Sequence, residues 1–251
     1  MSAEQLYDLL KTKFKEVLSE NHLEEEAVTI HCRALSPEEA IGVTKRNDFP
    51  IIMGKDIMVQ AEYRGGKGQA FTDAPADFSG TLADVADLDI TNDVHARGVF
   101  IASLNAVMNA LGRCKGTVHC RTDGPELCAK EMEAYLDKHY ANAKRIGLVG
   151  YQPALLEMLA TSDYEVRVLD LNPANVGEIR YGIKVEDGQT DRDAVMEWAD
   201  LILCTGSTIC NGTIVDYLNL DKKVLFFGIS IAGAADILGV KRVCFAEYLT
   251  D

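Results

Sequence analysis

The stretch KRIGLVG (144–150) decides how the second half of the chain folds. It is a short apolar run that ends in glycine, which is typical of a buried strand followed by a turn. Similar runs stand at 165–170 (EVRVLD), 200–206 (DLILCTG) and 222–228 (KKVLFFG). Helical patterns separate them, and apolar strands that alternate with helices form parallel sheets covered on both faces. The sequence therefore predicts a Rossmann-like parallel-sheet domain over 143–251.

The elements around these strands complete the predicted order of the chain. In the second half we expect helices from Pro153 and at 193–199 and 211–220, a helical turn near 232–238, and a last strand at 241–246. In the first half we expect a helix at 4–20, short strands at 27–35, 40–44, 50–53 and 57–63, and helices at 80–88, 96–112 and 125–140. This pattern predicts a small α+β domain over 1–142, and α/β as the class of the whole chain.

Composition excludes several classes of partner. The chain has 251 residues, 47% of them hydrophobic, and a net charge of −14. It contains no cluster of basic residues to attract a nucleic acid and no apolar run that could span a membrane. The charged amphipathic start does not resemble a signal peptide, and the seven cysteines fit reduced thiols. We therefore predict a cytoplasmic protein with a small-molecule or metal ligand, and a homodimer is plausible on symmetry grounds.

The carboxyl ends of the predicted parallel strands are the first candidate site, because ligands bind there in open α/β sheets. The polar and small residues at these ends are Gly150, Tyr151, Asp170, Asn172, Thr205, Gly206, Ser207 and Thr208. The turn GLVGYQP (147–153) departs from the G-x-G-x-x-G fingerprint of dinucleotide-binding proteins, which argues against NAD. Asp170 is placed to hold a ribose hydroxyl or to cap the next turn. The TGST segment is placed to bind an anion or to cap a helix.

The second candidate site is the pair of polar stretches MGKDIMVQ (53–60) and RGGKGQAFTD (64–73). The latter lacks the spacing of a phosphate-binding P-loop and follows a hairpin strand, so we expect a turn at its first two glycines. As catalytic candidates we name Lys55, Asp56 and Asp73, the carboxylates for proton transfer. The ligand-binding candidates of this region are Gly54, Lys67, Gln69 and Thr72. The alternative for Lys67 is a solvated side chain in a turn.

A third candidate lies in CKGTVHCRTDGPELC (114–128), where His119, Cys120 and Cys128 offer soft ligands for a metal. Their spacing matches no structural zinc motif, so ordinary thiols are the alternative. Cys204 and Cys244 stand in apolar runs, which is typical of buried, unreactive thiols.

Several of these stretches, in the same order, resemble the putative heavy-metal chelation family. In the first half they are 51–82 (IIMGKDIMVQAEYRGGKGQAFTDAPADFSGTL) and 96–112 (ARGVFIASLNAVMNALG). In the second half they are 146–155 (IGLVGYQPAL), 168–177 (VLDLNPANVG), 201–213 (LILCTGSTICNGT) and 226–233 (FFGISIAG). The resemblance implies an enolase-N-terminal-like domain followed by a Rossmann-like domain, with an active site between them.

Two functions follow from that resemblance. The first is an enzyme of condensation or hydrolysis in the metabolism of pterin-, flavin- or siderophore-like chelators. The second is a non-catalytic protein that binds a metal or a metallophore. The ligand would be a divalent heavy metal or a pterin- or nucleoside-like molecule. In a shared cleft, Lys55, Gln69 and Asp73 would face the strand ends near Gly150, Asp170 and Gly206.

Overall fold

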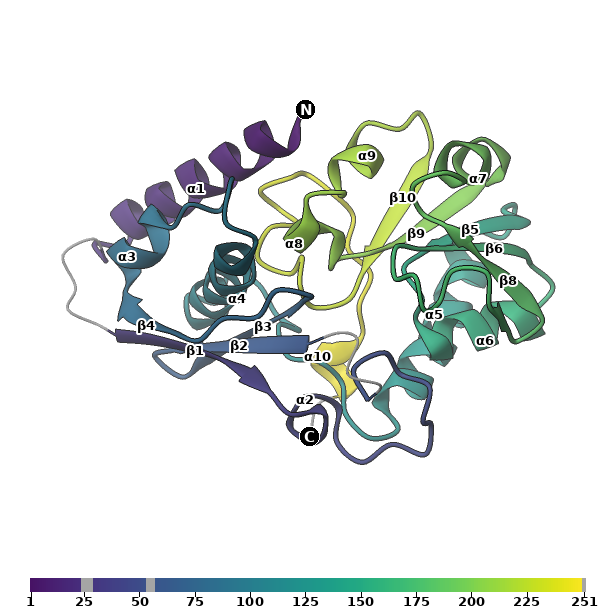
Figure 1. Cartoon of the computed structure of the whole chain (residues 1–251), viewed down its shortest axis with the longest axis horizontal. Helices are drawn as coiled ribbons and strands as arrows, with labels where there is room; N and C mark the ends of the chain where they lie inside the picture. Colours follow the sequence, from purple (N-terminus) through teal and green to yellow (C-terminus); the bar gives the residue numbers. More distant parts are fainter. Residues whose placement is uncertain (24–28, 53–56, 250–251) are drawn as a thin grey trace.

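A computed structural model of the chain describes residues 1–23, 29–52 and 57–249. It has a mixed α/β architecture in which two separate sheets lie side by side with helices packed around them (Figure 1). The first sheet is built from the first half of the chain and the second sheet from the second half. The predicted α/β class is confirmed.

The first sheet is antiparallel and has four strands in the order β3-β2-β1-β4. Their bounds are β1 Thr29–Leu35, β2 Ile57–Tyr63, β3 Gly66–Thr72 and β4 Phe78–Thr81. The β2–β3 hairpin pairs Tyr63 with Gly66, so its loop is Arg64 and Gly65. Both loop residues have positive φ, 47° and 82°, as the tightest hairpin turns require. The expected turn is present, one residue earlier than predicted.

Helices cover one face of this sheet and meet the second half of the chain. They are α1 Ala3–Glu20, α3 Leu82–Asp87 and α4 Val94–Ala110, while the short α2 Pro37–Ile41 follows β1. Helix α4 lies against the sheet and is buried on nearly all sides (Figure 1). A helix that is apolar all round is buried in a core. In α1, Tyr7 reaches the second half, where its hydroxyl donates to the carbonyl of Ile209.

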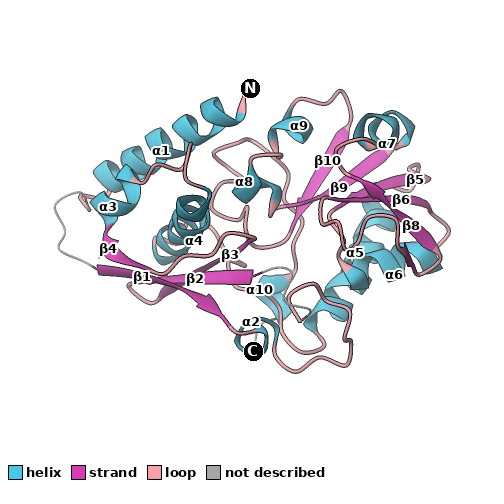
Figure 2. Ribbon diagram, viewed as in Figure 1, coloured by secondary structure: helices cyan, strands magenta, loops and turns pink. Residues whose placement is uncertain are grey.

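The second sheet has six strands in the order β10-β9-β5-β6-β8-β7 (Figure 2). The strands are β5 Arg145–Val149, β6 Glu165–Asp170, β7 Ile179–Arg180, β8 Ile183–Asp187, β9 Leu201–Thr205 and β10 Lys223–Phe227. The helices are α5 Gly124–His139, α6 Pro153–Thr161, α7 Arg192–Trp198, α8 Thr208–Asn211, α9 Val215–Leu218 and α10 Ala246–Leu249. All strand pairs are parallel except β7–β8. The first strand, β5, lies between β6 and β9, so the strand order reverses there, as in doubly wound folds.

Four local predictions are wrong. Residues 37–41 are helix α2 rather than the start of a strand at 40–44, because Ser36 and Glu39 form a capping box. Residues 50–52 form a turn. The helix expected at 211–220 is divided into α8 and α9 by Gly212, whose φ is 81°. At 241–246 only Arg242 bridges to β10, and α10 begins at Ala246.

The two halves share a hydrophobic core. A single cluster of buried side chains joins α1 and α4 to β9 and β10, and includes Phe14, Phe100, Cys204 and Phe226. A second cluster lies between the second sheet and helices α5 and α6. Because the halves pack through apolar side chains, residues at their boundary are held in fixed relative positions.

Candidate interdomain site

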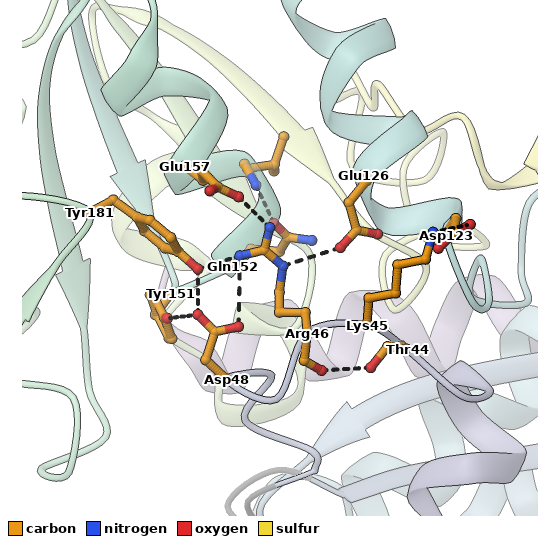
Figure 3. Close-up of polar contacts among 11 residues, drawn as sticks. Thr44, Lys45, Arg46, Asp48, Asp123, Glu126, Tyr151, Gln152, Glu157 and Tyr181 are labelled. Atoms are coloured by element: carbon orange, nitrogen blue, oxygen red, sulfur yellow. Dashed lines mark hydrogen bonds and ion pairs between the residues drawn. The ribbon is translucent and has the colours of Figure 1, made fainter.

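A loop of the first half, residues 42–50, reaches across to the helices of the second half (Figure 3). Its Arg46 lies among carboxylates from three parts of the chain. Arg46 Nε donates to Glu126 Oε1 of α5 at 3.1 Å, and its terminal nitrogens bond to Glu157 of α6 and lie 3.7 Å from Asp48. The Arg46 side chain is only 15% exposed. This cluster of charges holds the loop against the second half.

Asp48 is the second anchor of the loop. Its Oδ2 accepts hydrogen bonds from two tyrosine hydroxyls, that of Tyr151 at the end of β5, at 3.1 Å, and that of Tyr181 beside β7. Burial, and then the Asp48 carboxylate, raise the pKa of Tyr151 to about 12. The same causes raise the pKa of Tyr181. Both phenols therefore remain neutral donors over the whole physiological pH range.

These raised pKa values predict a loss of stability at alkaline pH. An unfolded tyrosine has a pKa of about 10. A folded-state pKa above that value gives stability that is complete below pH ~10 and is lost as the pH rises toward the folded pKa. Tyr151→Phe removes this contribution. We therefore expect the gap in unfolding free energy between the wild type and Tyr151→Phe, measured in urea, to narrow above pH ~10. A gap that is independent of pH would contradict this role of Tyr151.

A pocket of about 570 Å³ opens beside Arg46. Its lining residues are Lys45, Arg46, Asp48, Asp123, Glu126 and Leu127. Two oxygens of its lining residues, Asp48 Oδ1 and Glu126 Oε2, are buried and accept no hydrogen bond from the residues that the structure describes, although Asp48 Oδ1 lies 3.7 Å from an Arg46 nitrogen. Buried polar atoms in folded proteins nearly always have a partner, so an unpaired one needs an explanation. These two oxygens mark the pocket as the candidate site.

Of the predicted strand-end residues, Tyr151 bonds to Asp48 of the pocket lining, and the polar atoms of the others are largely used within the fold. Asp170 accepts from the backbone N–H groups of Tyr151, at 2.8 Å, and Asn172, at 2.6 Å. It therefore caps two turns, which was one of the two readings open from the sequence. Asn172 in turn accepts from Ala174 N–H. Gly150, with φ of 88°, lies so near Thr205 that an added Cβ would be 2.5 Å from its methyl group.

The start of α6 is also filled by the chain itself. Gln152 Oε1 accepts from Leu155 N–H at 2.5 Å, and Pro153 occupies the first turn. In dinucleotide-binding proteins this helix start takes the pyrophosphate on free N–H groups. In this chain the Gln152 side chain occupies the position of the pyrophosphate, which agrees with the departure of GLVGYQP from the glycine fingerprint.

The polar side chains of the TGST segment (205–208) likewise form hydrogen bonds within the segment. Thr208 donates its hydroxyl to Thr205 O at 2.7 Å, and the hydroxyls of Thr205 and Ser207 bond to each other at 3.0 Å. Gly206 N–H donates to Phe227 O. Of the two readings of this segment, anion site and helix start, the local bonds favour the helix start.

The 64–73 stretch contacts a strand end of the second half through its backbone. Phe71 N–H donates to Ser230 Oγ at 3.0 Å. Gln69 is buried, donating to Gln60 and accepting from His119 N–H. Thr72 is buried and accepts from Ala74 N–H. Phe71 therefore bonds to the second half, whereas these side-chain bonds of Gln69 and Thr72 stay within the first, and none of the three residues lines the pocket.

The charged candidates of the first half lie elsewhere. Lys67 is about half exposed and lies 3.7 Å from Glu62 on the neighbouring strand. Asp73 is exposed and near Cys210 of α8, whose pKa is raised by burial first and by Asp73 second. Neither lines the pocket. Gly54, Lys55 and Asp56 lie outside the described residues, so the predicted placement of Lys55 stays a prediction.

Comparison with known protein families gives a match to part of the chain. Residues 135–241, which include β5 to β10, match the DUF364 family, described as putative heavy-metal chelation. This confirms the resemblance found in the sequence for the second half of the chain. No curated protein matches the chain.

Two solved DUF364 structures share the fold. A DUF364 protein of unknown function from Pyrococcus horikoshii has a TM-score of 0.51 and 17% identity, over 88% of this chain and 78% of that one. A DUF364 protein of unknown function from Desulfitobacterium hafniense has a TM-score of 0.50 and 13% identity, over 73% of this chain and 72% of that one. Identities this low establish a common fold. They carry no residue roles to this chain.

The metal candidates have to be examined separately from the DUF364 match, because all three precede residue 135. His119 Nδ1 lies 2.6 Å from Cys120 O, and its ring packs edge-on against Phe71. Burial lowers the pKa of His119, so the ring is neutral. The interaction between Cys120 and Cys128 raises the pKa of Cys120 and lowers that of Cys128. Within the described residues, no three His, Cys, Asp or Glu side chains are arranged to hold a metal ion.

The functional residues that the sequence did not indicate are Arg46, Asp48, Glu126 and Tyr181. They come from three distant segments, and each is an ordinary charged or aromatic residue in its local context. The only local signal for Arg46 and Asp48 is the tetrad KRND (45–48), a dense group of polar residues in a loop. Among the residues that the structure describes, no helix is long and apolar enough to cross a membrane.

Proposed function

We propose that this chain binds a small molecule rich in N–H groups, such as a pterin, in the pocket between its two halves. The observation that carries the proposal is the pair of buried carboxylate oxygens, Asp48 Oδ1 and Glu126 Oε2, that lack hydrogen-bond partners. Both residues line the same pocket. Its volume of about 570 Å³ is within the usual range for a small-molecule site.

The charges around the pocket select the kind of ligand. Arg46 is fully engaged by Glu126, Glu157 and Asp48. Lys45 is exposed and paired with Asp123. The groups of the site that can still bond to a ligand are therefore carboxylate oxygens, which are hydrogen-bond acceptors. They would repel an anionic siderophore or a phosphate and attract N–H donors. The amino and amide N–H groups of a pterin point in one direction along one edge, which suits two acceptors on neighbouring walls.

The proposed function is binding. Asp73, which the sequence suggested as an acid or base, is absent from the pocket wall, and Lys55 and Asp56 are outside the described residues. A hydrogen bond from a neutral donor to a charged acceptor contributes about 1.5–3 kcal/mol, enough for specific recognition by two such bonds. The cytoplasmic location and the homodimer stay predictions, which cell fractionation and light scattering would test.

Calorimetric titration with pterin, using the substitution Glu126→Gln, tests this proposal. Glutamine can keep the bond from Arg46 to its carbonyl oxygen, while its NH₂ group replaces the unpaired oxygen and faces the ligand with donors. Loss of one charged hydrogen bond predicts an affinity about 10- to 100-fold weaker. The matched control is Glu157→Gln, which alters another partner of Arg46 that is not on the pocket wall.

The control should bind pterin within about 3-fold of the wild type, since a change of that size is under 1 kcal/mol. If the wild type takes up no pterin, or if the two variants lose affinity equally, the assignment of the pocket is wrong. Thermal melts of all three proteins show whether either variant has lost its fold.

A further inference from the structure

A second pocket, of about 540 Å³, opens at the amino ends of strands of the second sheet. Arg145, Leu201 and Lys223, which are the first residues of β5, β9 and β10, line it together with Tyr140, the residue that follows α5. The three strands run parallel to one another. Tyr151 follows the carboxyl end of β5 and bonds to the lining of the proposed pterin pocket. The two pockets therefore lie toward opposite ends of β5.

One carboxylate of this second pocket is fully engaged within the fold. Asp200 Oδ2 accepts from the backbone N–H groups of Lys144 and Arg145, at 3.0 and 2.9 Å. Its Oδ1 pairs with the Arg145 guanidinium at 2.6 Å. Arg145 and Asp200 therefore neutralise each other, and the other carboxylate of the lining is the exposed Asp221. The charge that this pocket offers to a ligand depends on its lysines.

Two lysines of the lining contact neutral groups. Lys222 Nζ donates to the carbonyl oxygens of Glu197 and Ala199, at 2.6 and 2.7 Å. Lys223 Nζ lies 5.6 Å from the centroid of the Tyr140 ring. Carbonyl oxygens and an aromatic face orient an ammonium group without cancelling its charge. Both lysines therefore stay available to an anion.

A third lysine, Lys241, lies on the same tyrosine. Its Nζ donates to the Tyr140 hydroxyl at 3.2 Å and lies 5.4 Å from the centroids of the Tyr140 and Tyr135 rings. Within the part of the chain that the structure describes, no carboxylate pairs with Lys222, Lys223 or Lys241. Three uncompensated cations thus gather at one end of the sheet, in a chain whose net charge is −14.

We propose that this pocket binds a small phosphorylated molecule, whose phosphate group pairs with Lys222 and Lys223. Lysine binds phosphate as a point charge, whereas a carboxylate is held best by the two-pronged guanidinium of arginine. The guanidinium of the lining, that of Arg145, is engaged by Asp200. The lining therefore favours a phosphate over a carboxylate. A volume of about 540 Å³ suits a small molecule and leaves room for an organic part beside Tyr140.

The phosphate site is independent of the proposed pterin pocket. The two pockets share no lining residue, and their charges select ligands of opposite kind. Glu126→Gln should therefore leave phosphate binding unchanged, and pterin should not compete for this site. Failure of one proposal would leave the test of the other valid.

Calorimetric titration of the whole chain with inorganic pyrophosphate, at low ionic strength, tests the proposal. We expect saturable binding of one ion per chain. Lys223→Gln should weaken this binding by about 10-fold, the effect of losing one charged hydrogen bond. The matched control is Lys184→Gln, which makes the same change of charge at an exposed residue of β8, four positions from β10 in the strand order. Its affinity should stay within about 2-fold of the wild type, because distant surface charges are screened.

A measurement on the wild type guards against variants that fail to fold. Bound pyrophosphate should slow the acylation of Lys223, as mapped by peptide mass spectrometry, and leave that of Lys184 unchanged. Citrate, a carboxylate anion, should bind more weakly than pyrophosphate. The proposal is overturned if the wild type takes up no pyrophosphate, if Lys184→Gln loses as much affinity as Lys223→Gln, or if citrate binds as tightly as pyrophosphate.

Discussion

Asn105→Asp is expected to destabilise the protein at pH 7 by about 3–5 kcal/mol, the range for an uncompensated buried charge. Asn105 is fully buried in α4, and its Nδ2 donates to the carbonyls of Gln69 and Ser230, at 2.9 and 3.0 Å. It also donates to Ile229 O at 3.2 Å, while its Oδ1 accepts from Gly233 N–H. Aspartate would place a negative oxygen against three carbonyl oxygens at the boundary of the two halves.

The penalty should depend on pH. Burial beside carbonyls raises the pKa of an aspartate at this position above the unfolded value of about 3.9. The penalty is therefore complete well above that folded pKa and shrinks as the pH falls and the carboxyl group is protonated. Urea unfolding of wild type and variant at several pH values measures this. The control is Asn109→Asp, one turn later and partly exposed. Equal losses in the two variants would show that Asn105 does not hold the halves together.

Gly68→Ala is expected to destabilise the protein by about 3 kcal/mol, at the upper end of the range for overpacking. A Cβ at this position of β3 would lie 2.2 Å from Ala106 N and 2.3 Å from Ala102 O. Both atoms belong to the backbone of α4, so no side chain can turn aside to make room. The helix would have to move away from the sheet, and this movement would disturb the contacts that Asn105 makes.

Denaturant unfolding checks this expectation. Lys67→Ala is the neighbouring control, because Lys67 is about half exposed and its pair with Glu62 is a surface ion pair. Such pairs contribute about 0–1 kcal/mol. A Gly68→Ala protein as stable as Lys67→Ala would mean that β3 and α4 are not packed as closely as described.

The glycines of the 64–73 stretch show where the sequence was informative and where it was not. The glycines of RGGKGQAFTD were noticed as a dense polar stretch, and the hairpin turn followed from their pattern. Their second role, the close approach of α4 at Gly68, depends on a helix about 30 residues later in the chain. No local pattern reveals such a contact, so a glycine needed for packing looked like a glycine near a ligand.

The second half was more predictable because its strands are buried on both faces. Burial forces unbroken apolar runs, and these gave the positions of β5, β6, β9 and β10. The short edge strand β7 and its neighbour β8 lack such runs and were missed. In the first half, Ser36 and Glu39 carried the signature of a helix start, yet the apolar residues after them were read as a strand.

The candidate site was the least predictable part. Asp170 and Tyr151 follow their strands directly, and a rule about strand ends found them. Arg46, Asp48 and Glu126 meet only because a loop of the first half lies across the helices of the second. The function proposed for them depends on oxygens that accept no hydrogen bond, which is a property of the folded chain and has no counterpart in the sequence.

A crystal structure of the chain with pterin at saturating concentration tests the central claim most directly. The claim is that the pocket between Arg46 and α5 is a binding site in which Asp48 Oδ1 and Glu126 Oε2 accept hydrogen bonds from the N–H groups of a ligand. It predicts pterin in this pocket, with N–H groups at hydrogen-bond distance from Asp48 Oδ1 and Glu126 Oε2. Pterin bound elsewhere on the chain, or bound here with its N–H groups turned away from both carboxylates, would contradict it.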